Sequence, residues 1–301
     1  MTSTVTQRLR VDTGGTPFSL EFMPPRDAAG EELLWRTVRA FEAIDPAFVS
    51  ITYGAGGSTR DATARVVGEI AERTTLLPVA HLTAVAHSVV ELYEVVDGHA
   101  RRGVRNLLVL RGDPPGDPLG PWTKHPDGIE YAEQLVRLVA NRGEFHIGVA
   151  AFPEGHHAAP DLARDTATLA AKLRAGAHYA ITQMFFDPDC YLRLRDRLTA
   201  LDPEQADKPI IPGIMPILSL ASLRRMATLC DATLPSAMVA DLERAAGPGP
   251  EEDRDAVRAA GVDIATRLCE KLIAEGVPAL HFCTLNRFRA TREILANLGL
   301  R

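Results

Sequence analysis

The chain contains 301 residues and carries a formal net charge of −6, with 46% hydrophobic and 24% charged residues. This is ordinary globular composition, and it excludes a disordered or fibrous chain. The mild acidity and the lack of a long basic run argue against a nucleic-acid partner and against an anionic membrane surface. No stretch approaches the roughly 18 consecutive apolar residues that a transmembrane helix needs, and residues 1–15 lack the apolar core of a signal peptide.

Cysteine usage indicates the compartment. The four cysteines, Cys190, Cys230, Cys269 and Cys283, show neither a C-x-x-C pair nor the spacing of a zinc site. They are typical of free thiols in a reducing environment. Together with the absence of a targeting segment, this predicts a cytoplasmic protein.

Short β-rich apolar runs recur along the chain, and helical patterns separate them. The predicted strands are 18–22, 48–53, 78–84, 106–112, 146–152, 179–186, 210–217 and 279–285. Helical patterns between them include 31–44, 59–73, 89–102, 131–141 and 162–175. Such alternation predicts βαβ units joined into a parallel sheet.

Eight repeats favour a closed (β/α)8 TIM barrel over an open doubly wound sheet, because the first strand lacks the Gly-rich turn typical of the open fold. The interval between the last two strands is the longest and predicts extra helices at about 234–245 and 251–275. The Gly-Pro-Gly-Pro segment at 247–250 is too short for a domain linker and is typical of a loop. We therefore expect one domain over residues 1–301.

Two helix starts agree with this arrangement. Ser58 and Asp61 have the S-x-x-D spacing of a capping box directly after the second strand. Asp187 followed by Pro188 is typical of an N-cap with proline at the first helical position, directly after the sixth strand.

Barrels of this class carry their functional groups at the carboxyl ends of the strands. Polar residues cluster at the predicted ends: Glu21, Thr52, His81, Thr83, Arg111, Asp113, His156, Gln183, Thr284 and Asn286. Packing alone hardly explains such a concentration at one end of the barrel. The sequence therefore predicts a site there.

Glu21 is the most informative of these residues. Side chains alternate along a strand, so Phe18, Leu20 and Phe22 share one face while Ser19 and Glu21 share the other. The apolar face suits the helix layer, which leaves Glu21 pointing into the barrel near its mouth. Partial desolvation there should raise its pKa and make it a general acid, although a structural pairing with an arginine is about as good an explanation.

Two further groups fit an anionic ligand less specifically. Arg111 could hold a phosphate or carboxylate, Gly112 could admit a ligand close to the backbone, and Asp113 could accept hydrogen bonds; a structural ion pair at a strand end is also a plausible explanation, so the motif alone is only suggestive. Asp165 and Lys172 are two helical turns apart and share one face, which suits a ribose and a diphosphate or, more simply, a solvated helix face.

The sequence disfavours a metal site. His81, His87, His156 and His157 form no H-x-x-x-H or H-E-x-x-H pair. No phosphate-binding loop or strand-linked G-x-G-x-x-G is present, and the stretch 54–57 is typical of a tight turn before a helix, which can also bind an anion.

Eight motifs, taken together, identify a family. They are FSLEFMPPR (18–26), ITYGAGGSTRD (51–61), HLT (81–83), LRGDPP (110–115), VAAFPEGH (149–156), AITQMFFD (180–187), PGIMPI (212–217) and TLNR (284–287). In order, and over essentially the whole chain, they closely resemble methylenetetrahydrofolate reductase. The chain is similar to the short bacterial type, which lacks a C-terminal regulatory domain.

The resemblance implies a FAD-containing (β/α)8 enzyme of one-carbon metabolism and methionine biosynthesis. It would reduce 5,10-methylenetetrahydrofolate to 5-methyltetrahydrofolate with NADH or NADPH in a ping-pong reaction: the nicotinamide gives a hydride to the flavin and leaves, and the folate then takes that hydride. NADH, NADPH and assembly into a homo-oligomer all stay open.

The resemblance also implies residue roles. Glu21 matches the general acid that protonates the folate as its methylene bridge opens to the 5-iminium ion. Asp113 matches the acid beside the flavin ring that also assists folate binding, and Gln183 matches the side chain that bonds the pterin and the nicotinamide amide. The matched flavin contacts are Thr52, His81, Arg111, Gly112, Asp113, Tyr131, Ala132, His156, Asp165 and Lys172.

The chain departs from the family pattern around the predicted cofactor site. Leu220, in the predicted loop after the seventh strand, stands where many relatives have a phenylalanine that packs over nicotinamide and folate, and it lacks the stacking face. Phe152 replaces a flavin-contact tyrosine, and His156-His157-Ala158-Ala159 replaces H-P-E-A. Direct hydride transfer from NADH to the folate, a non-catalytic binding barrel and metal-dependent hydrolysis are the alternatives.

Overall fold

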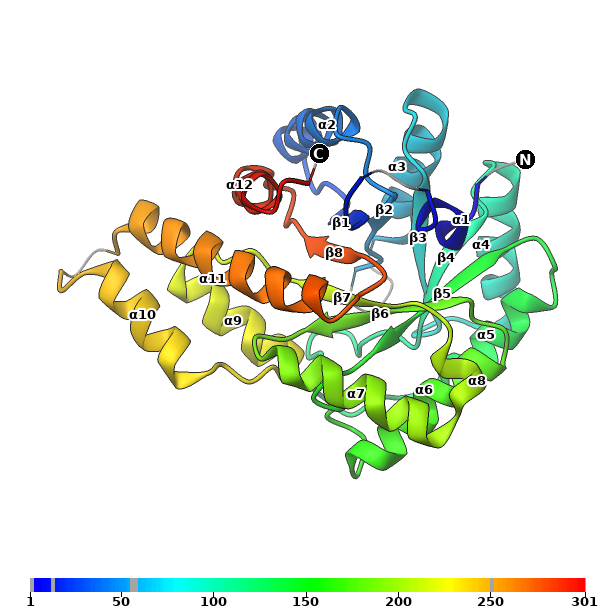
Figure 1. Cartoon of the computed structure of the whole chain (residues 1–301). Helices are drawn as coiled ribbons and strands as arrows, with labels where there is room; N and C mark the ends of the chain where they lie inside the picture. Colours follow the sequence, from blue (N-terminus) through cyan, green and yellow to red (C-terminus); the bar gives the residue numbers. More distant parts are fainter. Residues whose placement is uncertain (1–2, 12–13, 55–58, 250–251, 301) are drawn as a thin grey trace.

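A closed barrel of eight parallel strands forms the centre of the protein (Figure 1). The computed structural model describes residues 3–11, 14–54, 59–249 and 252–300. The strands are β1 (Phe18–Phe22), β2 (Phe48–Ile51), β3 (Pro78–Thr83), β4 (Asn106–Leu110), β5 (His146–Ala151), β6 (Tyr179–Met184), β7 (Ile210–Ile214) and β8 (Leu280–Cys283). They pair in chain order, and β8 pairs with β1 to close the barrel. The predicted (β/α)8 fold is confirmed.

Helices surround the strands. They are α1 (Val5–Arg8), α2 (Ala28–Glu42), α3 (Arg60–Arg73), α4 (Val89–Arg101), α5 (Ala132–Ala140), α6 (Leu162–Arg174), α7 (Pro188–Leu201), α8 (Pro203–Ala206), α9 (Leu220–Cys230), α10 (Ser236–Ala246), α11 (Arg254–Ala274) and α12 (Arg289–Asn297). The five helices predicted up to residue 175 are found within three residues of their predicted ends. The predicted strands are right at their starts, to within a residue, and up to three residues too long at their ends.

Alternating side chains divide the core into two layers. Phe18, Leu20 and Phe22 of β1 pack outward in the layer beneath the helices, together with Leu34 and Val38 of α2. A separate cluster fills the barrel interior, where Phe48 of β2, Val79 of β3, Leu108 of β4 and Tyr179 of β6 meet. Val5 of α1 belongs to this inner cluster and is fully buried, so α1 covers the amino-terminal end of the barrel.

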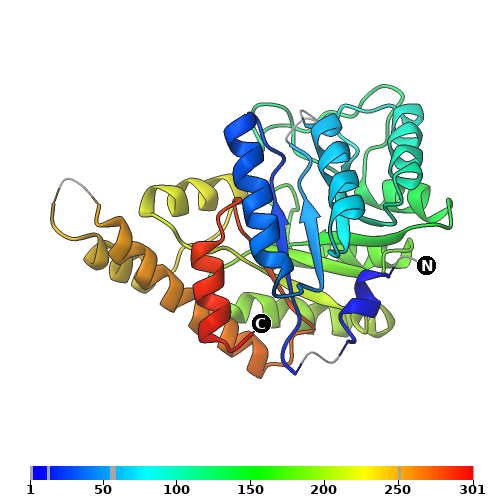
Figure 2. The same ribbon diagram turned by 90° about the horizontal axis from the view of Figure 1, so that it is seen from above.

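The interval between β7 and β8 contains three helices, α9, α10 and α11, where two were predicted. Figures 1 and 2 show α10 and the start of α11 extending beyond the rest of the molecule. Leu220 was predicted in a loop, but it is the first residue of α9, whose N-cap is Ser219. Apolar side chains of α9, α10 and α11 pack against Met184 and Met215 at the ends of β6 and β7.

One of the two predicted helix caps is confirmed. Asp187 is the N-cap of α7, its side chain accepts a hydrogen bond from the Asp189 N–H, and Pro188 is the first helical residue. For α3 the N-cap is Thr59, without a side-chain cap bond. Ser58 lies outside the described residues, as do most residues of the predicted turn at 54–57.

None of the helices within the described ranges combines the length and apolar character that crossing a bilayer requires.

Candidate active site at the carboxyl ends of the strands

Glu21 points into the barrel, as its strand position predicts. Its Oε2 lies 3.5 Å from His81 Nε2 on β3 and 3.7 Å from His281 Nε2 on β8. Both histidines are almost completely buried, and the Glu21 side chain is 23% exposed. Glu21 is therefore a carboxyl group with buried imidazoles behind it and solvent, or a ligand, in front.

The predicted direction of its pKa shift is wrong for this environment. Burial alone raises the pKa of Glu21, but the interactions with His281, His81 and Cys283 outweigh burial and lower it below the ordinary value. The sequence argument considered desolvation alone, because the pairing of β1 with β8 is not visible in a local pattern. A ring that covered Glu21 would remove more water and raise this pKa.

Two cysteine thiols lie near Glu21. Burial and the Asp113 and Glu21 carboxylates raise the pKa of Cys230 to about 11. Burial, Glu21 and Cys230 raise the pKa of Cys283 well above its ordinary value. Both groups are thus neutral thiols at physiological pH. Because both carboxylates affect the pKa of Cys230, Glu21 and Asp113 lie at the same end of the barrel.

Thr284 and Asn286 have a structural role instead of the predicted site role. Thr284 Oγ1 donates to the Glu21 carbonyl at 2.7 Å. The Asn286 amide accepts from the Met23 N–H and donates to the Met23 carbonyl, each at 2.8 Å. Leu285 and Asn286 both adopt left-handed backbone conformations, with φ of +50° and +57°. This turn ties the end of β8 to the end of β1.

Arg111, Gly112 and Asp113 follow β4. Burial lowers the pKa of Arg111 while Asp113, Tyr131 and Glu130 raise it, so Tyr131 lies within electrostatic reach of this guanidinium. Although Asp113 is exposed, the protein atoms around it raise its pKa, and His157 and Arg111 act in the opposite direction.

Trp122, which the sequence analysis did not single out, fixes this segment. The Arg111 guanidinium lies 5.0 Å from the centre of its indole ring. Its Nε1–H donates to the Gly112 carbonyl at 3.1 Å. The signal in the sequence that could have identified this residue is a tryptophan in a Pro/Gly-rich stretch after the fourth strand.

The structure gives a reason for the glycine at 112 besides the predicted one. Gly112 has φ of +85°, and an added Cβ would lie 2.7 Å from Val85 Cγ1 and 2.8 Å from Thr83 Cβ. The protein's own packing therefore requires a glycine here, independently of any ligand.

Asp165 and Lys172 lie on a buried face of α6, which excludes the solvated-face explanation. Lys172 Nζ donates to the Ala150 carbonyl at the end of β5 at 2.5 Å and lies 5.8 Å from the Phe152 ring centre. Burial lowers the pKa of Lys172 to about 8, Asp165 raises it, and Arg111 lowers it. Asp165 Oδ1 accepts from the His156 N–H at 3.3 Å.

Two positive charges therefore lack a close negative partner. Among the described residues, neither Arg111 nor Lys172 forms an ion pair within 4 Å. His156 adds no third positive charge near neutral pH, since burial, followed by His157, Arg111 and Lys172, lowers its pKa to about 4. The His156 ring packs edge-on to Phe152 at 4.8 Å and stacks on His157 at 4.3 Å. Two cations beside a group of rings fit the diphosphate and a ring of a dinucleotide.

The remaining predicted residues lie at the same end of the barrel but are grouped less tightly around Glu21. Gln183 follows the inward-facing Ile181 of β6 at an irregularity in the β6–β7 pairing, and its Oε1 accepts from the Met184 N–H at 2.9 Å. The Leu220 N–H donates to Glu252 Oε1 at 2.9 Å. Thr52 follows β2 half-buried, while Ala132 begins α5 beside its exposed N-cap, Tyr131. In the described part of the chain, Gln183 and Leu220 make no hydrogen bond with Glu21.

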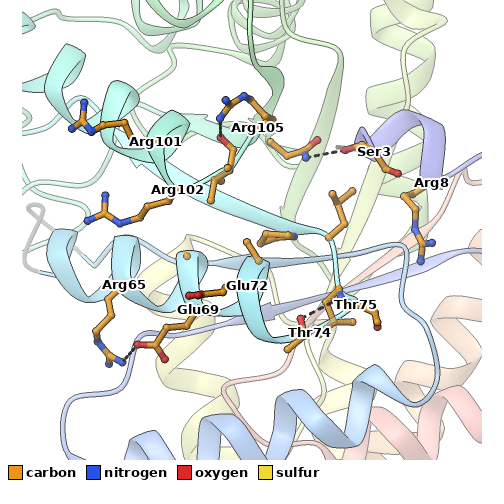
Figure 3. Close-up of a pocket in the computed structure, with 18 residues that line it drawn as sticks. Ser3, Arg8, Arg65, Glu69, Glu72, Thr74, Thr75, Arg101, Arg102 and Arg105 are labelled. Atoms are coloured by element: carbon orange, nitrogen blue, oxygen red, sulfur yellow. Dashed lines mark hydrogen bonds and ion pairs between the residues drawn. The ribbon is translucent and has the colours of Figure 1, made fainter. Parts of the chain in front are cut away.

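A separate cavity of about 840 Å³ lies at the opposite end of the barrel, where β3 and β4 begin (Figure 3). Arg8, Arg65 and Arg105 line it, and each already pairs with a carboxylate: Asp45, Glu31 and Glu144. None of the predicted site residues, all of which the structure describes, lines this cavity. It is therefore distinct from the candidate site.

Within the described ranges, no group of three or more His, Cys, Asp or Glu side chains is arranged to hold a metal ion.

The chain is similar to known proteins over almost its whole length. The family model described as methylenetetrahydrofolate reductase matches residues 5–299. A 5,10-methylenetetrahydrofolate reductase from Pectobacterium carotovorum subsp. carotovorum is 38% identical over 283 residues, which cover 94% of this chain and 90% of the relative. One from Salmonella typhimurium is 36% identical, covering 98% and 95%.

A solved structure shares the fold. It is an uncharacterized protein from Clostridium thermocellum that binds two copies of 5-methyl-5,6,7,8-tetrahydrofolic acid, with a TM-score of 0.62 and 12% sequence identity, covering 98% of this chain and 97% of that one.

Proposed function

The chain belongs to the methylenetetrahydrofolate reductase family of oxidoreductases, and we propose that it reduces 5,10-methylenetetrahydrofolate to 5-methyltetrahydrofolate with NADH or NADPH. One observation carries the proposal: a solvent-accessible carboxyl, Glu21, and two unpaired cations, Arg111 and Lys172, lie at the same end of one barrel. The names of the relatives and the methyltetrahydrofolate bound by the structural neighbour support the substrate class.

FAD is the cofactor that the residues fit best. Arg111 and Lys172 would hold its diphosphate, and Asp165 would accept a hydrogen bond from a hydroxyl of the ligand. His156, Thr52, His81, Gly112, Tyr131 and Ala132 would complete its surroundings. When bound, FAD supplies a two-electron carrier that takes hydride from the nicotinamide and gives it to the folate in a ping-pong cycle.

Glu21 would supply the proton. Opening of the methylene bridge leaves a folate nitrogen that must be protonated, and a carboxyl at the end of β1 can donate to it. In the free protein the pKa of Glu21 is lowered, so a pterin that covers Glu21 has to desolvate it enough to favour the protonated form. Asp113 and Gln183 would bind the pterin, and Leu220 would give an apolar contact to either substrate.

The purified protein provides the first test. We expect a yellow protein whose flavin absorbance is bleached by NADH or NADPH and restored by the folate, and we expect Arg111→Ala or Lys172→Ala to diminish that absorbance. A colourless protein that still reduces the folate with NADH would support direct hydride transfer instead. A protein that binds folate without reducing it would contradict the proposal.

Glu21→Gln tests the acid. This variant should bind flavin and accept hydride from the nicotinamide, but its folate turnover should fall by about 10²–10⁴-fold, the usual contribution of a general acid. Asp61→Asn, at an exposed surface carboxylate, is the control. Folate turnover near that of the wild type in Glu21→Gln would exclude the role.

A further inference from the structure

The strand pairing that closes the barrel places a serine and a histidine behind Glu21. In the register of β1 and β8, Ser19 lies opposite His281 and Glu21 lies opposite Cys283. Ser19 Oγ is 2.8 Å from His281 Nδ1, and His281 Nε2 is 3.7 Å from Glu21 Oε2. Ser19 is fully buried and His281 is 1% exposed. A buried row of contacts therefore ends at the Glu21 carboxyl.

The orientation of the His281 ring is fixed from two directions. Its face stacks on Phe48, with ring centres 5.7 Å apart and planes 16° apart. Its Nδ1 is held by Ser19, whose hydroxyl also lies 3.3 Å from the Leu280 carbonyl. Among the described residues, Nε2 has no hydrogen-bond partner within 3.5 Å, and it faces the Glu21 carboxyl at 3.7 Å. A buried ring nitrogen without a partner is unfavourable, so Glu21 is its natural one.

We propose that His281, held by Ser19, is a positioning residue that sets the orientation and the protonation preference of the Glu21 carboxyl. This inference rests on the proposed role of Glu21 as the proton donor. Because the Glu21 carboxylate can only accept a hydrogen bond, we assign the ring proton to Nε2, which faces Glu21, and Nδ1 then accepts from the Ser19 hydroxyl, which donates to it in place of the Leu280 carbonyl. When the Glu21 proton moves to a folate nitrogen, Nε2–H donates to the carboxylate left behind, and the ring itself transfers no proton.

The other groups around Glu21 do not duplicate this role. Burial lowers the pKa of His81 to about 4, so this ring on β3 is neutral at physiological pH, and no serine of the described ranges forms a hydrogen bond with it. Cys283 on β8 and Cys230 at the end of α9 remain protonated thiols. The Asp113 carboxylate raises the pKa of Cys230. Near neutral pH, Glu21 is therefore the group whose titration His281 can influence, and the interaction with His281 lowers the pKa of Glu21 and so favours its charged form.

Ser19→Ala and His281→Gln test the proposal in the full chain. Ser19→Ala leaves the ring in place, so it remains informative if His281→Gln folds poorly. In both variants we expect folate turnover to fall roughly tenfold or more, and the basic limb of its pH profile to move up by about one pH unit, because the Nε2–H that favours the charged form of Glu21 is no longer fixed in Ser19→Ala and is replaced by a shorter, freely rotating amide in His281→Gln. The KM for the nicotinamide should stay unchanged.

A second readout needs no cofactor or substrate. In ¹⁵N NMR spectra of the wild type, His281 should be the Nε2–H tautomer, and Ser19→Ala should mix the tautomers. His99→Leu is the matched control, since His99 on α4 is equally buried and remote from Glu21, and it should leave the pH profile unchanged.

The outcomes separate the two claims. Lower turnover with an unmoved pH limb, or an Nδ1–H tautomer in the wild type, overturns the positioning role while leaving the proposed reaction intact. Full folate turnover in Glu21→Gln overturns the acid and the inference together.

Discussion

Lys172 is the residue whose buried charge bears most directly on cofactor binding. It is 6% exposed, and burial lowers its pKa to about 8. A bound diphosphate would favour the protonated amine and raise this pKa. FAD affinity should therefore be constant below pH 8 and fall at higher pH, by up to about tenfold per pH unit, as the free protein loses the proton that binding requires.

This pH dependence can be measured by fluorescence titration of the apoprotein with FAD between pH 6 and 10. Lys172→Met should bind FAD more weakly and without the loss above pH 8. Lys271→Met, at a surface lysine paired with Asp189, should behave as the wild type does. An affinity in the wild type that is level across this range would contradict the assignment of the diphosphate to Lys172.

Gly112 shows how one backbone position can constrain the site. Its φ of +85° already disfavours a side chain, and an added Cβ would also collide with Val85 and Thr83.

Gly276 has a similar φ of +74° with nothing near its Cβ position. Gly276→Ala should lower the free energy of unfolding by about 1 kcal/mol from backbone strain alone. Gly112→Ala should lower it by roughly 3 kcal/mol or more and should also weaken flavin binding, because Arg111 and Asp113 flank it. Urea denaturation of both variants checks this, and equal losses would show that the contacts with Val85 and Thr83 relax.

At the level of elements, the turn after β8 decides how the site end of the barrel is held. Asn286 makes two hydrogen bonds to Met23 in a left-handed conformation. Asn286→Ala should lower the free energy of unfolding by about 2–3 kcal/mol, since it removes both bonds and strains the backbone. Asn286→Gly loses the bonds but tolerates the positive φ, so it should be the less destabilised variant in thermal denaturation. The reverse order would mean that the hydrogen bonds contribute little.

Local pattern was sufficient for most elements and insufficient for their ends. The run 48–53 is apolar and β-rich throughout, but β2 ends at Ile51, because its neighbour β1 ends at Phe22 and the last bond between the two strands runs from the Thr52 N–H to the Phe22 carbonyl. Helix α9 was missed because its sequence continues the apolar stretch after β7, which hides the change of period at Ser219. Helix α1 has four residues and depends on the barrel interior that buries Val5.

At the scale of the whole molecule, the site depends on barrel closure, which no local pattern contains. Alternation along β1 was enough to predict that Glu21 points inward. The partners that set its chemistry, His281 and Cys283, come from a strand about 260 residues away and meet it only because β8 pairs with β1 in one register. The same closure explains why Thr284 and Asn286, expected at the site from their positions, instead tie the two strands together.

Burial of neutral histidines gives the whole molecule a characteristic acid sensitivity. Burial lowers the pKa values of His81, His99 and His156 to about 4 and that of His146 to about 3. The unfolded chain binds these protons near pH 6.5, so between about pH 6.5 and 4 the unfolded state holds more protons than the native state. The free energy of unfolding should therefore decrease as the pH falls through this range, with each histidine adding a slope of at most about 1.4 kcal/mol per pH unit.

His99→Leu isolates one of these contributions. Both ring nitrogens of His99 lack hydrogen-bond partners among the described residues, so leucine removes the titration without breaking a bond. The free energy of unfolding of the variant, minus that of the wild type, should be larger at pH 5 than at pH 8. In urea denaturation the variant should therefore show a shallower dependence of stability on pH. If His99→Leu keeps the wild-type slope, His99 is protonated in the native protein, and the acid sensitivity must come from the other buried histidines.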